Sequence, residues 1–222
     1  MIYLRKDLSS LLVKSMKQNP NVLIFSHAVG MINLEDEMKG LTEELIGLSL
    51  DLEKNKKTGV IKSNIGGYQT DLLKNSNRII KETQVVFSKA ITQFAETIYV
   101  KKPYRVNFDE PWLNVNRENH SNRTHSHPGS DLSLTYYCEV PVNSGKIVFE
   151  NPVLHQRTTS ICYEKHDVWN SEYIHLAPQK YALIIFPSYL PHFVEPNKSN
   201  KPRISLACNA QIRNAPDRRV IK

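Results

Sequence analysis

The chain has 222 residues, of which 40% are hydrophobic and 23% charged, and its formal net charge is +7. This balance is typical of a globular protein, and the length is sufficient for one sizeable core. Because no run of about 18 apolar residues occurs and the first residues lack the apolar centre of a secretion signal, we expect no membrane span and a cytoplasmic location.

The positive charge is scattered, apart from short basic pairs and the terminal segment 213–222. No basic stripe is interleaved with aromatic residues, as nucleic-acid surfaces often are. A nucleic acid therefore stays open as substrate or partner but is not favoured. Cys138, Cys162 and Cys208 are odd in number and lack metal-ligand spacing, which favours thiols over disulfides, with Cys138 and Cys208 buried in apolar strands.

The first hundred residues show mainly helical spacing. A short helix is predicted over 8–16, a strand over 22–32, and a helix beginning after Asn33, whose side chain can cap it. Paired glycines predict an irregular loop at 62–70. A longer helix over 77–99 should pack along a sheet with one apolar face.

From Tyr104 onward the apolar period changes from helical to extended. Eight short strands are predicted, separated by Pro, Gly and Asn turns: 104–108, 112–116, 132–140, 146–149, 173–176, 181–186, 192–195 and 203–211. This pattern indicates an α+β chain with a sandwich or jelly roll whose outer face is covered by the preceding helices. We expect one domain over 1–222, with helical scaffold in 1–100, the β core in 101–212 and a basic tail in 213–222.

Two histidines with one residue between them, His125 and His127, predict a metal site. On an extended strand both side chains project to the same side. The distant His192 can then complete one face of an octahedron around a metal ion. Arg203 and Ser205 share parity on the last strand, and a guanidinium fork matches a carboxylate in a bidentate way. A metal beside an anchored diacid indicates oxygenase chemistry.

An ordered set of motifs carries a resemblance to a known family. The sequence resembles the Fe(II)- and 2-oxoglutarate-dependent oxygenases, specifically an uncharacterised branch with His-X-His-Pro-X-Ser and Phe-Pro-Ser-X-Leu-X-His patterns. The matching segments are 63–69 with Tyr68 in the aromatic place, 125–130, 136–137, 186–192 and 203–205. The resemblance covers nearly everything from 22 to 211.

This resemblance implies a double-stranded β-helix, a cupin-like jelly roll, that holds Fe(II) by three side chains and leaves positions for 2-oxoglutarate and O2. His125 and His192 match the histidines of the usual pattern. His127 stands where that pattern has a carboxylate, so three neutral imidazoles would leave the metal a dication. The alternatives are that Asp131 is the third ligand, or that solvent or an anion takes the position.

The resemblance also implies the cosubstrate contacts. Arg203 and Ser205 would grip the distal carboxylate of 2-oxoglutarate, and Tyr137 would donate a hydrogen bond to it. Asn114 shares a strand face with Trp112 and could contact the cosubstrate by its amide, although a satisfied buried asparagine is an equal expectation. We expect the substrate to enter between the loop 63–69 and a lid over 156–169.

The expected activity is hydroxylation of an unknown substrate, coupled to oxidative decarboxylation of 2-oxoglutarate to succinate and CO2. Two other classes stay open. One is a three-histidine metal dioxygenase on a cupin-like barrel that does not use 2-oxoglutarate, and the other is a non-enzymatic barrel that serves binding or assembly. Neither the substrate nor a homo-oligomeric state can be deduced from these residues.

Overall fold

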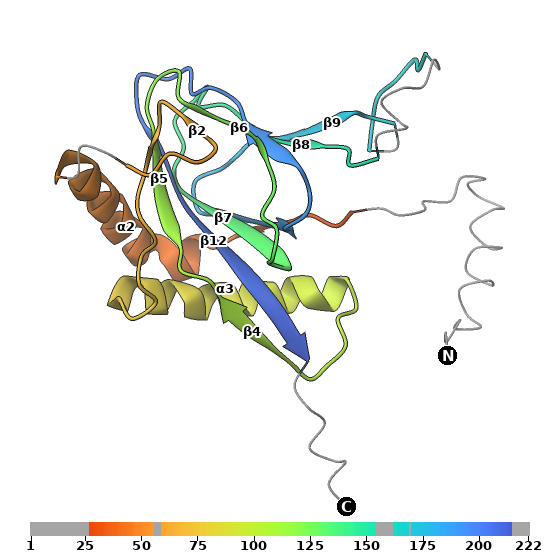
Figure 1. Ribbon diagram of the computed structural model, residues 1–222, viewed down its shortest axis with the longest axis horizontal. Coiled ribbons are helices and arrows are strands. Elements are labelled where there is room, and N and C mark those ends of the chain that lie inside the picture. Colours follow the sequence, from red (N-terminus) through yellow and green to blue (C-terminus); the bar gives the residue numbers. More distant parts are fainter. Residues whose placement is uncertain (1–26, 56–58, 154–161, 169, 215–222) are drawn as a thin grey trace, which may run out of the picture.

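The computed structural model describes residues 27–55, 59–153, 162–168 and 170–214 (Figure 1). The predicted helix over 8–16 and half of the predicted lid over 156–169 lie outside these residues. Of the predicted strand over 22–32, the described part forms β1 (Gly30–Asn33). Within the described residues no helix is both long and apolar enough to span a bilayer.

Two helices begin after asparagine caps, of which Asn33 was predicted as a cap and Asn77 as the start of a helix. In α2 (Glu35–Asn55) the Asn33 Oδ1 atom accepts a hydrogen bond from the Glu35 amide at 2.8 Å. In α3 (Arg78–Thr97) the Asn77 Oδ1 atom accepts from the Ile79 amide at 2.9 Å. Each cap satisfies an amide that has no partner within the helix, so the sequence signal and the observed start agree.

The strands form two antiparallel sheets. The larger has the order β1-β10-β7-β12-β5-β3, with β4 paired to β12, and the smaller has the order β2-β6-β11-β8-β9. The bounds are β2 (Asn64–Ile65), β3 (Tyr68–Gln69), β4 (Tyr104–Phe108), β5 (Trp112–Asn116), β6 (Ser121–His125), β7 (Leu132–Glu139), β8 (Ile147–Glu150), β9 (Tyr173–Leu176), β10 (Ala182–Pro187), β11 (His192–Val194) and β12 (Arg203–Asn214). The predicted jelly roll is confirmed. β2 and β3 were not predicted as strands, and β6 was expected only through the spacing of His125 and His127, which placed both on one extended strand. The first residues of the predicted basic tail belong to β12.

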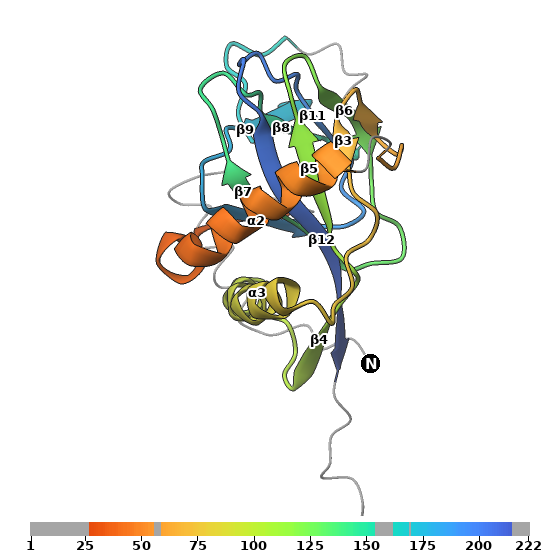
Figure 2. The same cartoon turned by 90° about the vertical axis from the view of Figure 1, so that its left-hand side faces the viewer.

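The helices cover the outer face of the larger sheet, as Figures 1 and 2 show for α2 against β5, β7 and β12. The main core lies between helices and sheet, and a smaller core lies between the two sheets. Tyr136 belongs to the first and bonds Thr42 at 2.6 Å, whereas Tyr137 belongs to the second. The predicted opposite orientation of these tyrosines is confirmed. Cys138 and Cys208 are buried free thiols, also as predicted.

Candidate metal centre and cosubstrate cavity

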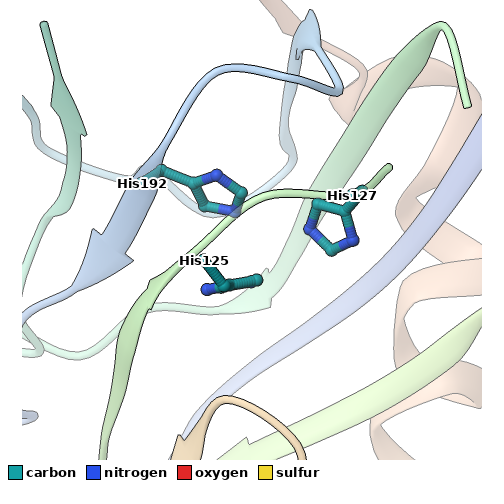
Figure 3. Close-up of side chains that lie close together, drawn as sticks. All are labelled: His125, His127 and His192. Atoms are coloured by element: carbon teal, nitrogen blue, oxygen red, sulfur yellow. The ribbon is translucent and has the colours of Figure 1, made fainter. Parts of the chain in front are cut away.

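Three histidines converge between the two sheets (Figure 3). His125 ends β6 and is the cross-strand partner of His192, which begins β11. Their ring centroids lie 4.3 Å apart, and the His127 ring lies 5.0 Å from His125 and 5.2 Å from His192. One nitrogen of each ring lies within 4.8 Å of the others. The predicted trio therefore forms one cluster of three nitrogen donors.

His127 reaches the cluster in a different way from the one predicted. The strand β6 stops at His125, and His127 follows in a loop. Pro128 has no amide hydrogen and restricts the residue before it, so the strand pairing does not continue. The His127 amide instead donates to the Ser188 carbonyl at 2.8 Å. This backbone bond, and not strand alternation, brings the ring to the other two.

Backbone carbonyls fix the tautomers of two rings. The His125 Nδ1 atom lies 2.8 Å from the Arg123 carbonyl oxygen, and the His192 Nδ1 atom lies 3.0 Å from that of Leu190. A carbonyl can only accept, so each Nδ1 carries the hydrogen and each Nε2 keeps a free lone pair. In His125 this Nε2 contacts the Ser63 hydroxyl at 3.4 Å.

The cluster is held neutral at pH 7. Burial, assisted by the neighbouring imidazoles, lowers the pKa of His192 to about 3 and that of His127 to about 4. Burial also lowers the pKa of His125. Metal ligation requires neutral imidazoles, and an all-nitrogen set suits divalent iron and its transition-metal neighbours. The residues therefore fit an Fe(II) ion, which would keep its full double positive charge.

Asp131, the alternative third ligand, lies outside this cluster. Its Oδ2 atom accepts hydrogen bonds from the Ile212 amide at 2.7 Å and from Arg213 Nη1 at 3.0 Å. Nearly half of its side chain is exposed. The carboxylate therefore ties the loop after His127 to the end of β12.

A cavity of about 660 Å³ opens beside the histidines. Its floor is the inner face of β5, β12 and β7, where cross-strand partners lie side by side in rows. The middle row holds Asn114, Ser205 and Tyr137. The row on one side of it holds Asn116 and Arg203, and the row on the other side holds Trp112, Ala207 and Thr135. The Trp112 ring lies 5.8 Å from the His127 ring, so the floor extends from the histidine cluster toward Arg203.

Arg203 is a buried guanidinium with unused hydrogen-bonding capacity. Its side chain is 2% exposed, and Nη1 donates to the carbonyls of Ser144 and Glu195. The buried Nη2 has no partner among the described residues, and no described carboxylate forms an ion pair with this arginine. Burial lowers the pKa of Arg203, opposed by Tyr137 and Glu195. Because an unpaired buried charge is costly, the site fits an incoming carboxylate.

The row next to Arg203 adds polar groups. Ser205 is 7% exposed, and burial raises the pKa of Tyr137 to about 12, so this phenol stays protonated and can donate. Asn114 also lines the cavity, as predicted from its strand face. Beyond Asn114, its partner Gln69 on β3 continues the row and is buried.

Several lining residues were not singled out from the sequence. They include Lys62, Gln69, Leu72, Asn122, Arg123 and Thr135. The motif 63–69 contained a signal for Gln69 only, while Lys62 and Arg123 stand in segments without apolar periodicity. The hypothesis that the loop 63–69 borders the substrate entrance is supported by Ser63, which contacts His125.

Comparison with known proteins agrees with this geometry. Residues 110–209 match a protein family described as "Putative 2OG-Fe(II) oxygenase". Comparison with curated proteins gave no match. Among solved structures, a Pseudomonas putida prolyl-4-hydroxylase aligns with a TM-score of 0.58 at 11% identity, covering 93% of this chain and 98% of that one.

Two further structures share the fold. A viral collagen prolyl hydroxylase from Paramecium bursaria Chlorella virus-1, in complex with 2OG, has a TM-score of 0.53 at 17% identity, covering 84% of this chain and 96% of its own. The epimerase SnoN from nogalamycin biosynthesis, described as dependent on α-ketoglutarate, has 0.60 at 11%, covering 93% and 84%. At these identities the likeness concerns the fold alone.

The chain therefore has the double-stranded β-helix fold, with a candidate metal site of three histidines inside the segment that matches the family model. The resemblance read from the sequence is supported over residues 110–209, the segment that matches the family model and contains the three histidines and Arg203.

Proposed function

We propose that the protein is a hydroxylase that couples the oxidative decarboxylation of 2-oxoglutarate to oxidation of a substrate C–H bond. One observation supports this most strongly. A cavity with three neutral imidazoles also contains the buried, incompletely bonded guanidinium of Arg203. A diacid is the natural partner of this pair, because it can chelate a metal at one end and neutralise an arginine at the other.

In this proposal His125, His127 and His192 hold the Fe(II), the first two named by position in the motif and the third by its place on β11. When bound, Fe(II) with 2-oxoglutarate supplies O2 activation, and one oxygen atom ends in succinate and the other in the substrate. The carbonyls of Arg123 and Leu190 keep the ligand rings oriented. The surrounding sheets limit the access of water.

The cosubstrate contacts follow from the rows of the floor. Arg203 would pair with the distal carboxylate, and Ser205 and Tyr137 would donate to it from the adjacent row. Asn114, beside Ser205, would offer its amide toward the other end. With these assignments, each hydrogen-bond donor of Asn114, Ser205 and Tyr137 would have a carboxylate oxygen of 2-oxoglutarate as its acceptor. A pocket for an apolar ligand would not need such donors.

The all-histidine cluster favours one competing function, a metal dioxygenase that does not use 2-oxoglutarate. Arg203 argues against it, because such an enzyme has no need for a buried guanidinium beside the metal. The two functions differ in whether succinate is formed.

The test is succinate release from 2-oxoglutarate by protein loaded anaerobically with Fe(II) and then exposed to O2. We expect Fe(II)-dependent release that is lost in His192→Ala and strongly reduced in Arg203→Met, but kept in the surface control Lys81→Gln. Substrate oxidation without succinate would establish the competing function. Failure to retain any metal would indicate the non-enzymatic barrel.

A further inference from the structure

The charges that line the cavity have one sign. Among the described residues, its lining contains Lys62, Arg123 and Arg203 and no aspartate or glutamate. Glu150 and Asp71 adjoin lining residues without belonging to the lining, and Glu150 accepts a hydrogen bond from Thr124. In the proposed function 2-oxoglutarate brings two negative charges, one toward the Fe(II) ion and one toward Arg203. The other two cations are then left without a counter-charge.

Lys62 and Arg123 lie next to each other and next to a ligand. The Arg123 amide donates to the Ser63 carbonyl at 2.8 Å. The register that pairs Asn64 with Asn122, continued by this bond, places Lys62 opposite Thr124, the neighbour of His125. Antiparallel partners have Cα atoms about 5 Å apart. The backbones of Lys62 and Arg123 therefore lie close to that of His125.

Both side chains are available to a ligand. Each is exposed at the mouth of the cavity, and within the described part of the chain neither forms an ion pair with a carboxylate. Arg117 on the same side shows the contrast, because its guanidinium forms a two-bond pair with Glu53. Two cations without a described counter-ion in one cavity lining give it a positive potential, which favours an anion there.

We infer that the substrate is a small molecule with an anionic group, phosphate or carboxylate, which Lys62 and Arg123 bind at the mouth while its reacting carbon reaches the metal. The inference rests on the proposed function and names its substrate class. A volume of about 660 Å³ is within the range of small-molecule sites and has room for a cosubstrate and a metabolite-sized substrate.

The test uses inorganic phosphate and acetate as probes, with chloride as a control for ionic strength. The protein is loaded with redox-inert Zn(II) and saturated with N-oxalylglycine, a non-reactive analogue of 2-oxoglutarate, so that the metal and Arg203 are occupied. Binding is followed by NMR shifts of the backbone amides. We expect saturable shifts at residues 62–65 and 121–125, and at least tenfold weaker binding in the double variant Lys62→Gln, Arg123→Gln.

The matched control is Lys81→Gln, Lys89→Gln, which removes the same charge from the exposed side of α3. This control should bind phosphate like the parent. Equal weakening in both double variants, or no saturable shift at these amides, would overturn the inference. The stronger of phosphate and acetate identifies the anionic group, and a tighter site for a single-stranded oligonucleotide would replace the small molecule by a polymer and also overturn it.

Failure of the proposed function gives a different result. If N-oxalylglycine does not bind the Zn(II)-loaded protein, the function is wrong, and the phosphate titration is then made on the protein as purified. Shifts at 62–65 and 121–125 that depend on Lys62 and Arg123 would still support an anion site. Their absence there would reject it independently.

Discussion

The buried guanidinium gives the sharpest prediction. Arg203→Met removes the charge and its hydrogen bonds while keeping much of the side-chain length. The variant should lose affinity for 2-oxoglutarate, because truncating one partner of a buried, hydrogen-bonded charge pair costs roughly 2–5 kcal/mol. At about 1.4 kcal/mol for each factor of ten, this is a loss of about 30-fold to several thousand-fold.

The structure indicates where in this range the loss should fall. Nη1 is already engaged with two backbone carbonyls, so Nη2 is the free donor, and full burial excludes water as a substitute. Arg203→Met would remove one strong charge-assisted hydrogen bond and the positive charge. We therefore expect a loss of affinity for 2-oxoglutarate near the middle of the range, at about 3 kcal/mol or roughly 100-fold. Arg203→Lys keeps the charge without the fork and should be intermediate.

The assay separates cosubstrate binding from the metal. Calorimetric titration of Zn(II)-loaded protein with N-oxalylglycine gives the cosubstrate affinity, and titration with Zn(II) alone gives the metal affinity. Arg203→Met should change the first about 100-fold and the second less than threefold. The unfolding free energy without ligands should change little, because the parent already has the cost of an unpaired buried charge. An unchanged affinity for N-oxalylglycine would refute the assignment of Arg203.

Three further predictions follow. Without metal, the free energy of unfolding should fall as the pH drops from about 6.5 toward 4, by roughly 1.4 kcal/mol per pH unit for each histidine, because the unfolded chain binds protons that the folded chain excludes. Urea-unfolding curves at pH 5 to 7 should show a smaller dependence on pH in His192→Gln than in the parent. An identical pH dependence would contradict the lowered pKa values. His127→Ala should weaken Zn(II) binding at least tenfold, whereas Asp131→Asn should leave it within threefold; the reverse order in calorimetry would make Asp131 the ligand. Thr42→Val should lower the unfolding free energy by about 1–3 kcal/mol by leaving the Tyr136 hydroxyl unpaired, with metal affinity unchanged; full stability in thermal melts would disprove this role.

The strands of the sheet core could be predicted because their apolar residues follow the spacing of extended, buried chain. Apolar residues alternate or run together along β5, β7, β10 and β12, and Pro, Gly and Asn separate them, so predicted and observed bounds agree within a few residues. The helix starts were predictable for the same local reason, since Asn33 and Asn77 cap as isolated signals.

The strand that carries the first histidine could not be predicted from periodicity. β6 has the sequence Ser-Asn-Arg-Thr-His, and its side chains face a polar cavity or solvent instead of a core. It is also irregular, because the register between β6 and β11 shifts between His192 and Val194. The way His127 reaches the cluster depends on its bond to Ser188, sixty-one residues away in the sequence, and no local pattern encodes such a contact.

Contacts with the histidines also explain the residue types of the motif 186–192, which ends in His192. Phe186 packs its ring 4.7 Å from the His192 ring, Ser188 holds the His127 loop through its carbonyl, and Leu190 orients His192 through its own. The motif therefore spaces Phe186, Ser188 and Leu190 so that they position the rings of His127 and His192. If His127 is the third ligand in place of a carboxylate, the metal would keep an extra positive charge, and no carboxylate among the described residues of the cavity lining would offset it. The proposed preference for anions would then arise partly from this ligand, and the variant His127→Asp should bind an anionic substrate less tightly even with Lys62 and Arg123 intact.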